Sequence, residues 1–299
     1  MDRLASMATF VKAADLGSFA AAAEATGMSA TMVGKHVQFL ESRLGVRLIS
    51  RTTRRQSLTE FGRAYYDRCR AILAQVEMAD AMASDHLDQP HGVLRVAAPA
   101  LLGRICVAPL LLDLSRRHPA LGLDLSLDDQ IVDLVAGAYD LGVRTGTIAS
   151  RPGLMVRRLG SHRMLVCASP DYIADRCQPL GLESLKDHVA VMYGRPGWEH
   201  AWLFRDHDGA RIAVAPPHKI RLNDMAAVAD ASVSGEGLSW LPAWLARPQL
   251  NTGALVEVLQ DQPCYAFDNY ALWPEAAHLP LRVRLALDVL ASELAARLR

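Results

Sequence analysis

The 27 residues from Arg63 to Gln89 contain neither glycine nor proline, and apolar side chains recur through this stretch at every third or fourth position. Together with Thr59 as a helix cap, this pattern predicts one long amphipathic helix. Its apolar stripe consists of Phe61, Tyr65, Cys69, Ile72, Val76, Ala79 and Ala83. A lone helix cannot bury such a stripe. A helix from a second copy would bury it and form a homodimer; packing against the protein's own body is the open alternative.

The composition changes at Asp88–Gly92, where polar residues flank Pro90 as in a hinge. The length of 299 residues also suggests about two domains. We therefore predict a first domain over residues 1–59, a linker helix and hinge over residues 60–91, and a second domain over residues 92–299.

The first domain has the pattern of three short helices. Ser18 and Ser29 are suitable caps for the second and third helices, and the turn Thr26-Gly27-Met28 lies between them. Leu4, Met7, Ala8 and Val11 recur at helical spacing in the first helix, and the predicted core face of the third helix is Val33, Val37, Leu40 and Leu44. Two helices joined by a three-residue turn with a glycine predict a helix-turn-helix.

A winged extension and a local excess of positive charge follow. Val46–Ile49 and Gln56–Leu58 are predicted to be short strands, with Arg51–Arg55 at the tip of the wing. Between Ser29 and Leu58 the basic residues are Lys35, Arg43, Arg47, Arg51, Arg54 and Arg55, and Glu41 is the only acid. The whole chain has zero net charge, so this excess is local. A solvated basic face is one interpretation, and a DNA-binding face is the other.

The position of these charges favours double-stranded DNA. A recognition helix presents short polar and basic groups from its N-terminal end to the major groove, and wing arginines contact phosphates. The third helix is expected to expose such groups, Lys35 and His36 included, on the side opposite Val33 and Val37. The predicted DNA-binding residues are Ser18, Ser29, Ala30, Thr31, Gly34, Lys35, His36, Gln38, Arg51, Thr52, Thr53, Arg54 and Arg55.

Beyond the hinge, strands alternate with helices. Such alternation predicts parallel sheets covered by helices. The predicted strands are Val93–Ala97, Leu121–Leu127, Leu141–Arg144, Leu154–Leu159, Met164–Ala168, Ala190–Tyr193, Leu238–Leu241 and Tyr265–Trp273. The predicted helices are Leu101–Arg117, Ile131–Ala136, one from Ser169-Pro170, one from about Asp224, and one from Leu281 to the end.

Motifs for enzymatic chemistry fail on inspection. Gly34-Lys35-His36 lacks the other residues of a P-loop, and Gly235-Glu236-Gly237 is followed by Trp240 where a dinucleotide fingerprint needs glycine. The ten histidines are scattered singly. We therefore predict no catalytic residues, no metal site and no cofactor. An enzyme that carries a DNA-binding module stays as an alternative.

Five cysteines, never spaced C-x-x-C, indicate reduced thiols in the cytoplasm. The start of the chain has no signal-peptide pattern, and its longest apolar run is far shorter than the ~20 residues of a membrane span, so no membrane partner is expected. Cys167 and Cys177 would be the pair to test if the protein were a thiol-redox-switched regulator.

Several stretches resemble LysR-type transcriptional regulators over nearly the whole chain. The matching segments are Phe10–Ala23, Leu40–Leu48, Arg51, Leu58–Gly62, Ala98-Pro99, Asp140–Gly146, Ala168–Tyr172, Asn223-Asp224 and Gly235–Pro242. Ala30–Gly34 departs from the family, because the usual glutamine and one serine of the recognition helix are missing. The resemblance implies a sequence-specific DNA-binding transcriptional regulator that forms a homodimer or, following the family pattern, a homotetramer.

The resemblance also implies a periplasmic-binding-protein-like effector domain of two α/β subdomains, here residues 92–162 plus 266–299 and residues 163–265. A small-molecule effector would lie between them, at the carboxyl ends of the strands. The predicted effector-binding residues are Pro99, Ala100, Leu101, Leu102, Leu127, Asp128, Asp129, Arg144, Thr145, Gly146, Tyr193, Gly194, Leu222 and Asn223. Helix N-termini near Ala100 and Asp224 favour an anion. Arg144 has two possible roles, binding the effector or pairing with an acid such as Asp140.

Overall fold

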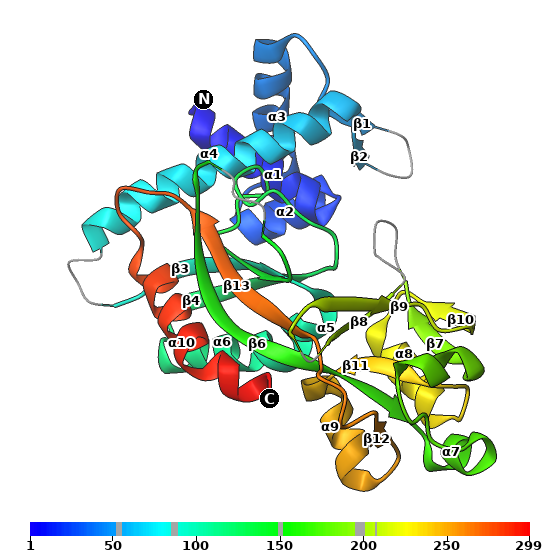
Figure 1. Cartoon of the computed structure of the whole chain (residues 1–299). Coiled ribbons are helices and arrows are strands. Elements are labelled where there is room, and N and C mark those ends of the chain that lie inside the picture. The colour runs from blue at the N-terminus through cyan, green and yellow to red at the C-terminus, as the bar shows by residue number, and fades with distance from the viewer. Residues whose placement is uncertain (52–55, 85–88, 149–151, 195–200, 207) are drawn as a thin grey trace.

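The computed structural model describes residues 1–51, 56–84, 89–148, 152–194, 201–206 and 208–299. A small helical domain and the long helix α4 lie at one end of the molecule, and two α/β parts follow (Figure 1). Two long strands, β6 and β13, run side by side from the first α/β part into the second.

The N-terminal domain contains α1 (Arg3–Leu16), α2 (Phe19–Thr26) and α3 (Ala30–Leu44). Ser18 Oγ accepts a hydrogen bond from Ala20 N at 3.2 Å, and Ser29 Oγ accepts one from Met32 N at 3.2 Å, so both predicted caps are confirmed. Gly27 ends α2 with φ +65°, which a side chain would disfavour. The helix-turn-helix is therefore present as predicted.

The buried face of α1 only partly follows its apolar pattern. Leu4 and Ala8 are exposed, whereas Met7 and Phe10 are buried. Ser6 and Thr9 are buried as well, and their hydroxyl groups donate to the carbonyls of Asp2 and Ala5. Because these polar residues satisfy their own hydrogen bonds within the helix, they can occupy core positions that an apolar pattern does not reveal.

The wing begins later than predicted. Strands β1 (Ile49–Arg51) and β2 (Gln56–Leu58) pair antiparallel, with Ile49 opposite Leu58. Before β1, the carboxylate of Glu41 accepts hydrogen bonds from the backbone N–H groups of Leu48 at 2.8 Å and Ile49 at 3.2 Å. Glu41, the only acidic residue between Ser29 and Leu58, thus fixes the backbone at the start of the wing. Thr52, Thr53, Arg54 and Arg55 lie outside the described residues.

Helix α4 (Glu60–Ser84) has its apolar stripe divided between two environments. Cys69 is fully buried and Tyr65 is half-buried in the core of the N-terminal domain, where the Tyr65 ring lies 5.8 Å from that of Phe10. Phe61 and Ile72 are 48% and 40% exposed. Part of the stripe therefore packs on the protein's own body, as the alternative interpretation held, and part stays accessible.

The main sheet has seven strands in the order β11-β6-β13-β5-β3-β4, with β12 also paired to β6. Its strands are β3 (Gly92–Ala98), β4 (Leu121–Leu127), β5 (Leu141–Thr145), β6 (Leu154–Ala168), β11 (Ser239–Pro242), β12 (Val256–Val258) and β13 (Ala266–Pro274). Strand β3 pairs parallel with β4 and β5, as predicted, but β13 and β6 pair antiparallel with their neighbours. The sheet is therefore mixed rather than parallel.

The two strands predicted at Leu154–Leu159 and Met164–Ala168 are one strand, β6. Gly160–Arg163, between the two predicted strands, also pair with β13, and the register of the pairing shifts between Asn269 and Tyr270. Gly160 makes this possible, because its backbone adopts φ +153° and a Cβ there would lie 3.3 Å from Ala295. The strand consequently crosses from one α/β part to the other.

The second α/β part includes elements that the sequence did not reveal. They are β8 (Trp202–Arg205), β9 (Arg211–Val214), β10 (His218–Leu222), α9 (Ala243–Thr252) and a 3₁₀ helix over Leu182–Asp187. The predicted elements found there are α7 (Pro170–Arg176), β7 (Ala190–Tyr193) and α8 (Met225–Val233). Strands β7 and β10 pair parallel, and β8 and β9 pair antiparallel.

The predicted helix over Ile131–Ala136 is wrong. The chain forms turns there, and Asp133 Oδ1 accepts hydrogen bonds from Val135 N at 2.9 Å and Ala136 N at 3.0 Å. Ala138 then adopts φ +53°, a left-handed conformation that ends any helical path.

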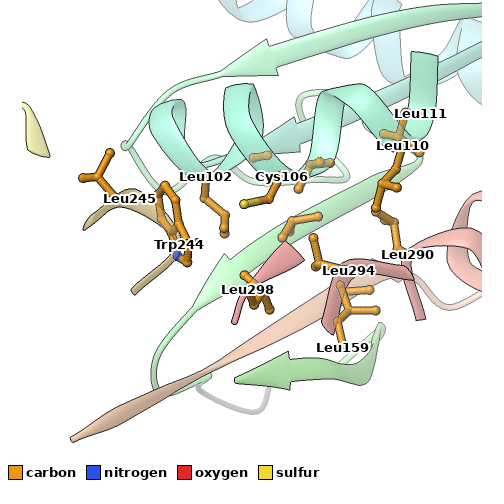
Figure 2. Close-up of a cluster of buried hydrophobic side chains, with 14 of the residues drawn as sticks. Leu102, Cys106, Leu110, Leu111, Leu159, Trp244, Leu245, Leu290, Leu294 and Leu298 are labelled. Atoms are coloured by element: carbon orange, nitrogen blue, oxygen red, sulfur yellow. The ribbon is translucent and has the colours of Figure 1, made fainter. Parts of the chain in front are cut away.

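Two long helical segments pack against each other beside the first half of the sheet. One runs from α5 (Ala100–Leu102) through a π-helical turn (Gly103–Val107) into α6 (Ala108–Arg117), and the other is α10 (Leu281–Arg297). Figure 2 shows Leu110, Leu290 and Leu294 meeting between them, with Trp244 and Leu102 at the other end of the cluster. At Gly103, a Cβ would lie 2.5 Å from Leu127 Cδ2, so any larger residue there would force the Leu127 side chain to move.

Candidate DNA-binding surface and effector cavity

The N-terminal half of α3 presents a polar, exposed surface. Ser29, Ala30, Thr31, Lys35 and Gln38 are all exposed. Gly34 is half-buried, and its Cα faces α2, where a Cβ would lie 3.8 Å from the ring of Phe19. Ser18 is half-buried because its hydroxyl caps α2.

His36 does not belong to this exposed surface. Its side chain is only 7% exposed, and its Nδ1 lies 2.9 Å from Ser6 Oγ in α1. Since the Ser6 hydroxyl donates to the Asp2 carbonyl, the His36 Nδ1–H donates to Ser6. Position 36 lies three residues after Val33 and four before Leu40, on the buried face of α3. The prediction that His36 lies on the exposed side of the helix is therefore wrong, and this spacing was the signal that could have corrected it.

Two further arginines extend the positive surface outside the predicted set. Arg43 and Arg47 are exposed near the end of α3 and before the wing. The backbone of Arg51 belongs to β1, but its side chain, like residues 52–55, lies outside the described part of the chain.

A cavity of about 430 Å³ lies between the two α/β parts. Nine of the predicted effector-binding residues line it: Pro99, Ala100, Leu101, Leu102, Leu127, Asp129, Arg144, Thr145 and Tyr193. The other lining residues are Arg104, Ile131, Thr147, Ile148, His162, Met164, Asp224, Met225, Pro242, Trp244 and Phe267. Its volume is in the range of small-molecule sites.

Five predicted effector-binding residues do not line this cavity. Asp128 is exposed and accepts a hydrogen bond from Gln130 N at 2.8 Å. Gly194 N donates to Leu222 O, which ties the ends of β7 and β10 together. Gly146 N donates to the Asp268 carbonyl, and the exposed Asn223 only precedes the cap of α8. The backbone hydrogen bonds of Gly146, Gly194 and Leu222 therefore have a structural role outside the cavity lining.

The sequence missed a cavity wall made by β6, β13 and the start of α9. His162 and Phe267 are paired neighbours on β6 and β13, and Trp244 stands edge-on to the His162 ring at 6.1 Å. The two strands predicted over Leu154–Leu159 and Met164–Ala168 leave His162 between them, so the sequence assigns it to neither strand. A continuous strand through Gly160–Arg163 would have placed it against the cavity.

Both helix N-termini that were expected to attract an anion carry carboxylate caps from the chain itself. Asp129 Oδ1 accepts a hydrogen bond from Ala100 N at 3.1 Å. Asp224 Oδ1 accepts from Ala226 N at 2.7 Å and from Ala227 N at 3.1 Å. These carboxylates occupy the amides that an anionic ligand would need.

Arg144 lines the cavity, and its Nη1 donates to the carbonyl of Val143 at 3.4 Å. Asp140, the suggested structural partner of Arg144, instead pairs with Arg282 at 3.2 Å and accepts a hydrogen bond from Arg95 N at 2.9 Å. The carboxylate of Asp140 is thus engaged at a different place in the fold.

Three polar side chains form a hydrogen-bonded chain at the cavity wall. The Thr145 hydroxyl donates to Asn269 Oδ1 at 2.7 Å, and Asn269 Nδ2 lies 3.0 Å from His162 Nδ1. Burial lowers the pKa of His162 to about 4, so its ring is neutral at physiological pH. Asn269 is fully buried and does not reach the cavity lining.

The cysteines offer little support for a thiol switch. Burial raises the pKa of Cys167 to about 12, which keeps it protonated and unreactive at neutral pH. Cys69 and Cys106 are also buried, and burial raises the pKa of each to about 11.

Two family models match this architecture in the order of its domains. The bacterial regulatory helix-turn-helix protein model of the lysR family matches residues 4–63, and the LysR substrate binding domain model matches residues 87–295. The chain belongs to the LysR family of transcriptional regulators. As a LysR-type regulator it is a DNA-binding protein with an effector-binding domain, and it is not an enzyme.

Individual relatives agree with this assignment. The regulator is 34% identical over 288 residues to an HTH-type transcriptional regulator of Xanthomonas campestris pv. campestris, with 95% of this chain and 83% of the relative covered. It is 30% identical to the HTH-type transcriptional activator AaeR of Escherichia coli, with 97% and 93% covered. The CrgA structure from Neisseria meningitidis is 29% identical, with a TM-score of 0.62 and 97% and 98% covered.

The fold of the LysR-type regulator is also similar to that of AphB, the virulence activator of Vibrio cholerae, in its full-length structure. The identity is 25% and the TM-score is 0.61, with 98% of this chain and 99% of that chain covered. In the part of the chain that the structure describes, no helix has the length and apolar character needed to cross a membrane.

Proposed function

We propose that this LysR-type regulator binds a specific double-stranded DNA site as a homo-oligomer, and that a small molecule bound between its two α/β subdomains sets its affinity for that site. The cavity between them carries this proposal, because residues from both parts line it. A ligand that contacts both parts can bias their relative arrangement through its differential affinity for the two states. Its site of action is the cytoplasm, where chromosomal DNA lies.

The proposed division of labour follows the three segments. Residues 1–59 bind DNA, residues 60–91 link and dimerise, and residues 92–299 bind the effector through subdomains 92–162 plus 266–299 and 163–265. Support for the dimer comes from Phe61 and Ile72, which are large apolar side chains left exposed on α4. A tetramer would follow the pattern of the family.

The DNA contacts are proposed on α3 and the wing. Thr31, Lys35 and Gln38 are exposed in the half of α3 that enters the major groove in proteins of this type. Arg51, Arg54 and Arg55 are proposed to bind phosphates, which would add affinity without sequence information. His36 is removed from the proposed set because it is buried.

An anionic effector was predicted from the helix N-termini, and the caps by Asp129 and Asp224 remove that argument. The remaining candidates for binding a negative group of the effector are Arg104 and Arg144, which both line the cavity. We therefore propose an effector with an apolar body and little negative charge.

The test measures binding to the DNA flanking the gene by fluorescence anisotropy, with and without a panel of small metabolites. Leu101→Trp would fill the cavity and should abolish the response to an active metabolite while leaving unliganded DNA binding intact. Leu180→Trp, at a position that is 95% exposed, is the matched control and should respond normally. A full response from the Leu101→Trp protein would place the effector elsewhere and overturn the proposal.

A further inference from the structure

The cavity wall contains one polar chain whose hydrogen-bond directions are set by a buried amide. Thr145 on β5, Asn269 on β13 and His162 on β6 are linked by contacts of 2.7 and 3.0 Å. The carbonyl oxygen of an amide only accepts hydrogen bonds and its NH₂ group only donates them. Asn269 therefore forces the Thr145 hydroxyl to donate inward and His162 Nδ1 to accept.

These directions determine what the chain presents to the cavity. With Nδ1 accepting, the neutral ring of His162 carries its proton on Nε2, which becomes a donor. Within the described residues, Nε2 has no hydrogen-bond partner. The hydroxyl proton of Thr145 is committed to Asn269, so its lone pairs are what it can offer a ligand. Thr145 and His162 both line the cavity, so this part of its wall supplies one acceptor and one donor.

The surroundings of this pair are apolar. Met164, Trp244, Phe267 and Ile148 line the same cavity, and the ring of Phe267 lies 6.0 Å from that of His162. In such surroundings a ligand group that matches only one of two polar partners leaves the other without a hydrogen bond, which costs binding free energy. A hydroxyl group matches both, because it donates and accepts at one atom.

We propose that the Thr145–Asn269–His162 chain selects an effector that carries a hydroxyl group on a ring-sized apolar body, with the hydroxyl donating to Thr145 Oγ and accepting from His162 Nε2. This inference rests on the proposed function, since it assigns the chemical class of the effector for the same cavity. Thr145 and His162 contact the ligand, and Asn269 acts as a positioning residue.

The experiment compares three fluorinated rings of similar size by ¹⁹F NMR titration of the full-length protein. 4-Fluorophenol donates and accepts, 4-fluoroanisole only accepts, and 4-fluorotoluene does neither. We expect 4-fluorophenol to bind about tenfold more tightly than either of the other rings, because two hydrogen bonds in apolar surroundings are made only by the phenol.

Variants test which side chains cause the preference for 4-fluorophenol. Thr145→Val and His162→Phe should each reduce it to less than about threefold, while Thr145→Ser, which keeps the hydroxyl, should retain it. Thr147→Val is the matched control, because Thr147 lines the cavity outside the hydrogen-bonded chain. Melting temperatures of all variants show whether each is folded, and the Thr145→Ser protein keeps the test decisive if Thr145→Val does not fold.

The outcomes separate this inference from the proposed function. If the preference for the phenol is absent, if none of the rings binds, or if Thr145→Val and His162→Phe retain the preference, the hydroxyl assignment is overturned. DNA affinity is measured in parallel. A phenol preference with no effect of any ring on DNA binding would overturn the proposed function alone. DNA binding that responds equally to the toluene and the phenol would overturn the hydroxyl assignment alone.

Discussion

Arg282 and Asp140 form an ion pair in the interior of the regulatory domain, with Arg282 Nη2 3.2 Å from Asp140 Oδ1 and the two side chains 4% and 8% exposed. Arg282 lies in the first turn of α10, and Asp140 immediately precedes β5. Asp140 Oδ2 also accepts a hydrogen bond from Arg95 N on β3. One carboxylate therefore joins a helix to two parallel strands.

Breaking this pair should destabilise the regulatory domain strongly. Either Asp140→Ala or Arg282→Met leaves one buried charge without its partner, at an expected cost of about 3 kcal/mol. The double variant should lose less stability than the two single variants lose in sum, because it leaves no buried charge unpaired. Urea unfolding of the three variants measures this. Additive losses would mean that the two side chains act independently.

His162 should make the stability of the regulator depend on pH. Its folded pKa, about 4, is below the ordinary value of 6.5 because the ring is buried. Between these values the unfolded chain binds the proton more readily, so stability is complete above about pH 6.5 and is lost as the pH falls toward 4. Lowering the pH from about 7.5 to about 5 should reduce the contribution of His162 to the free energy of unfolding by about 2 kcal/mol.

Urea unfolding at both pH values checks this, with His162→Asn as the reference that cannot titrate. Over the same pH interval, the free energy of unfolding of the wild type should fall by about 2 kcal/mol more than that of the variant. Equal losses would show that His162 is solvated or already charged in the folded protein.

His36→Ala should weaken the N-terminal domain rather than change its sequence preference. The variant loses a buried hydrogen bond to Ser6 and leaves a small cavity between α1 and α3, for a cost of about 2 kcal/mol. Gln38→Ala, at an exposed position, should leave stability unchanged and alter the preferred DNA sequence. Thermal unfolding and competition with randomised DNA sites measure both. A relaxed preference in a fully stable His36→Ala protein would return His36 to the DNA-binding set.

Arg54→Ala should weaken binding to the specific site and to random DNA by similar factors. The salt dependence should fall by about one phosphate contact, because a phosphate contact carries no base information. Anisotropy titrations at several salt concentrations measure the slope. Arg158→Ala removes a surface arginine that pairs with Asp268 at 2.7 Å in the regulatory domain, and it should change neither quantity. Loss confined to the specific site would show that Arg54 reads bases.

Ile72→Asp should dissociate the dimer without unfolding the chain. Ile72 is 40% exposed on α4, and a carboxylate there would carry its charge into the proposed apolar interface, at a cost of several kcal/mol if it stayed buried. Sedimentation velocity of the full-length protein should then show a monomer. Asp67→Ala, on a different face of the same helix, should remain a dimer. A dimeric Ile72→Asp protein would mean that the stripe is not the interface.

The local order of the N-terminal domain was determined by the sequence alone. Ser18, Ser29 and Gly27 act through their own backbone neighbours, so their roles as caps and turn could be predicted without the rest of the chain. The same is true of β4 and β7, whose predicted bounds match the structure, since short apolar runs between turns are local patterns. The matches to the LysR family confirm the domain order that these patterns implied.

Only the tertiary structure decided which side chains share a site. His162, Asn269 and Thr145 lie on three strands that are far apart in the sequence, and their contacts depend on antiparallel pairing that apolar periodicity does not encode. Asp129 caps the helix that begins at Ala100 because β4 and β3 end side by side. His36 is buried because α1 packs on its side of α3. In each case a polar side chain forms a hydrogen bond to a residue that is distant in sequence. Its contacts in the folded chain, rather than its sequence neighbours, therefore determine its role.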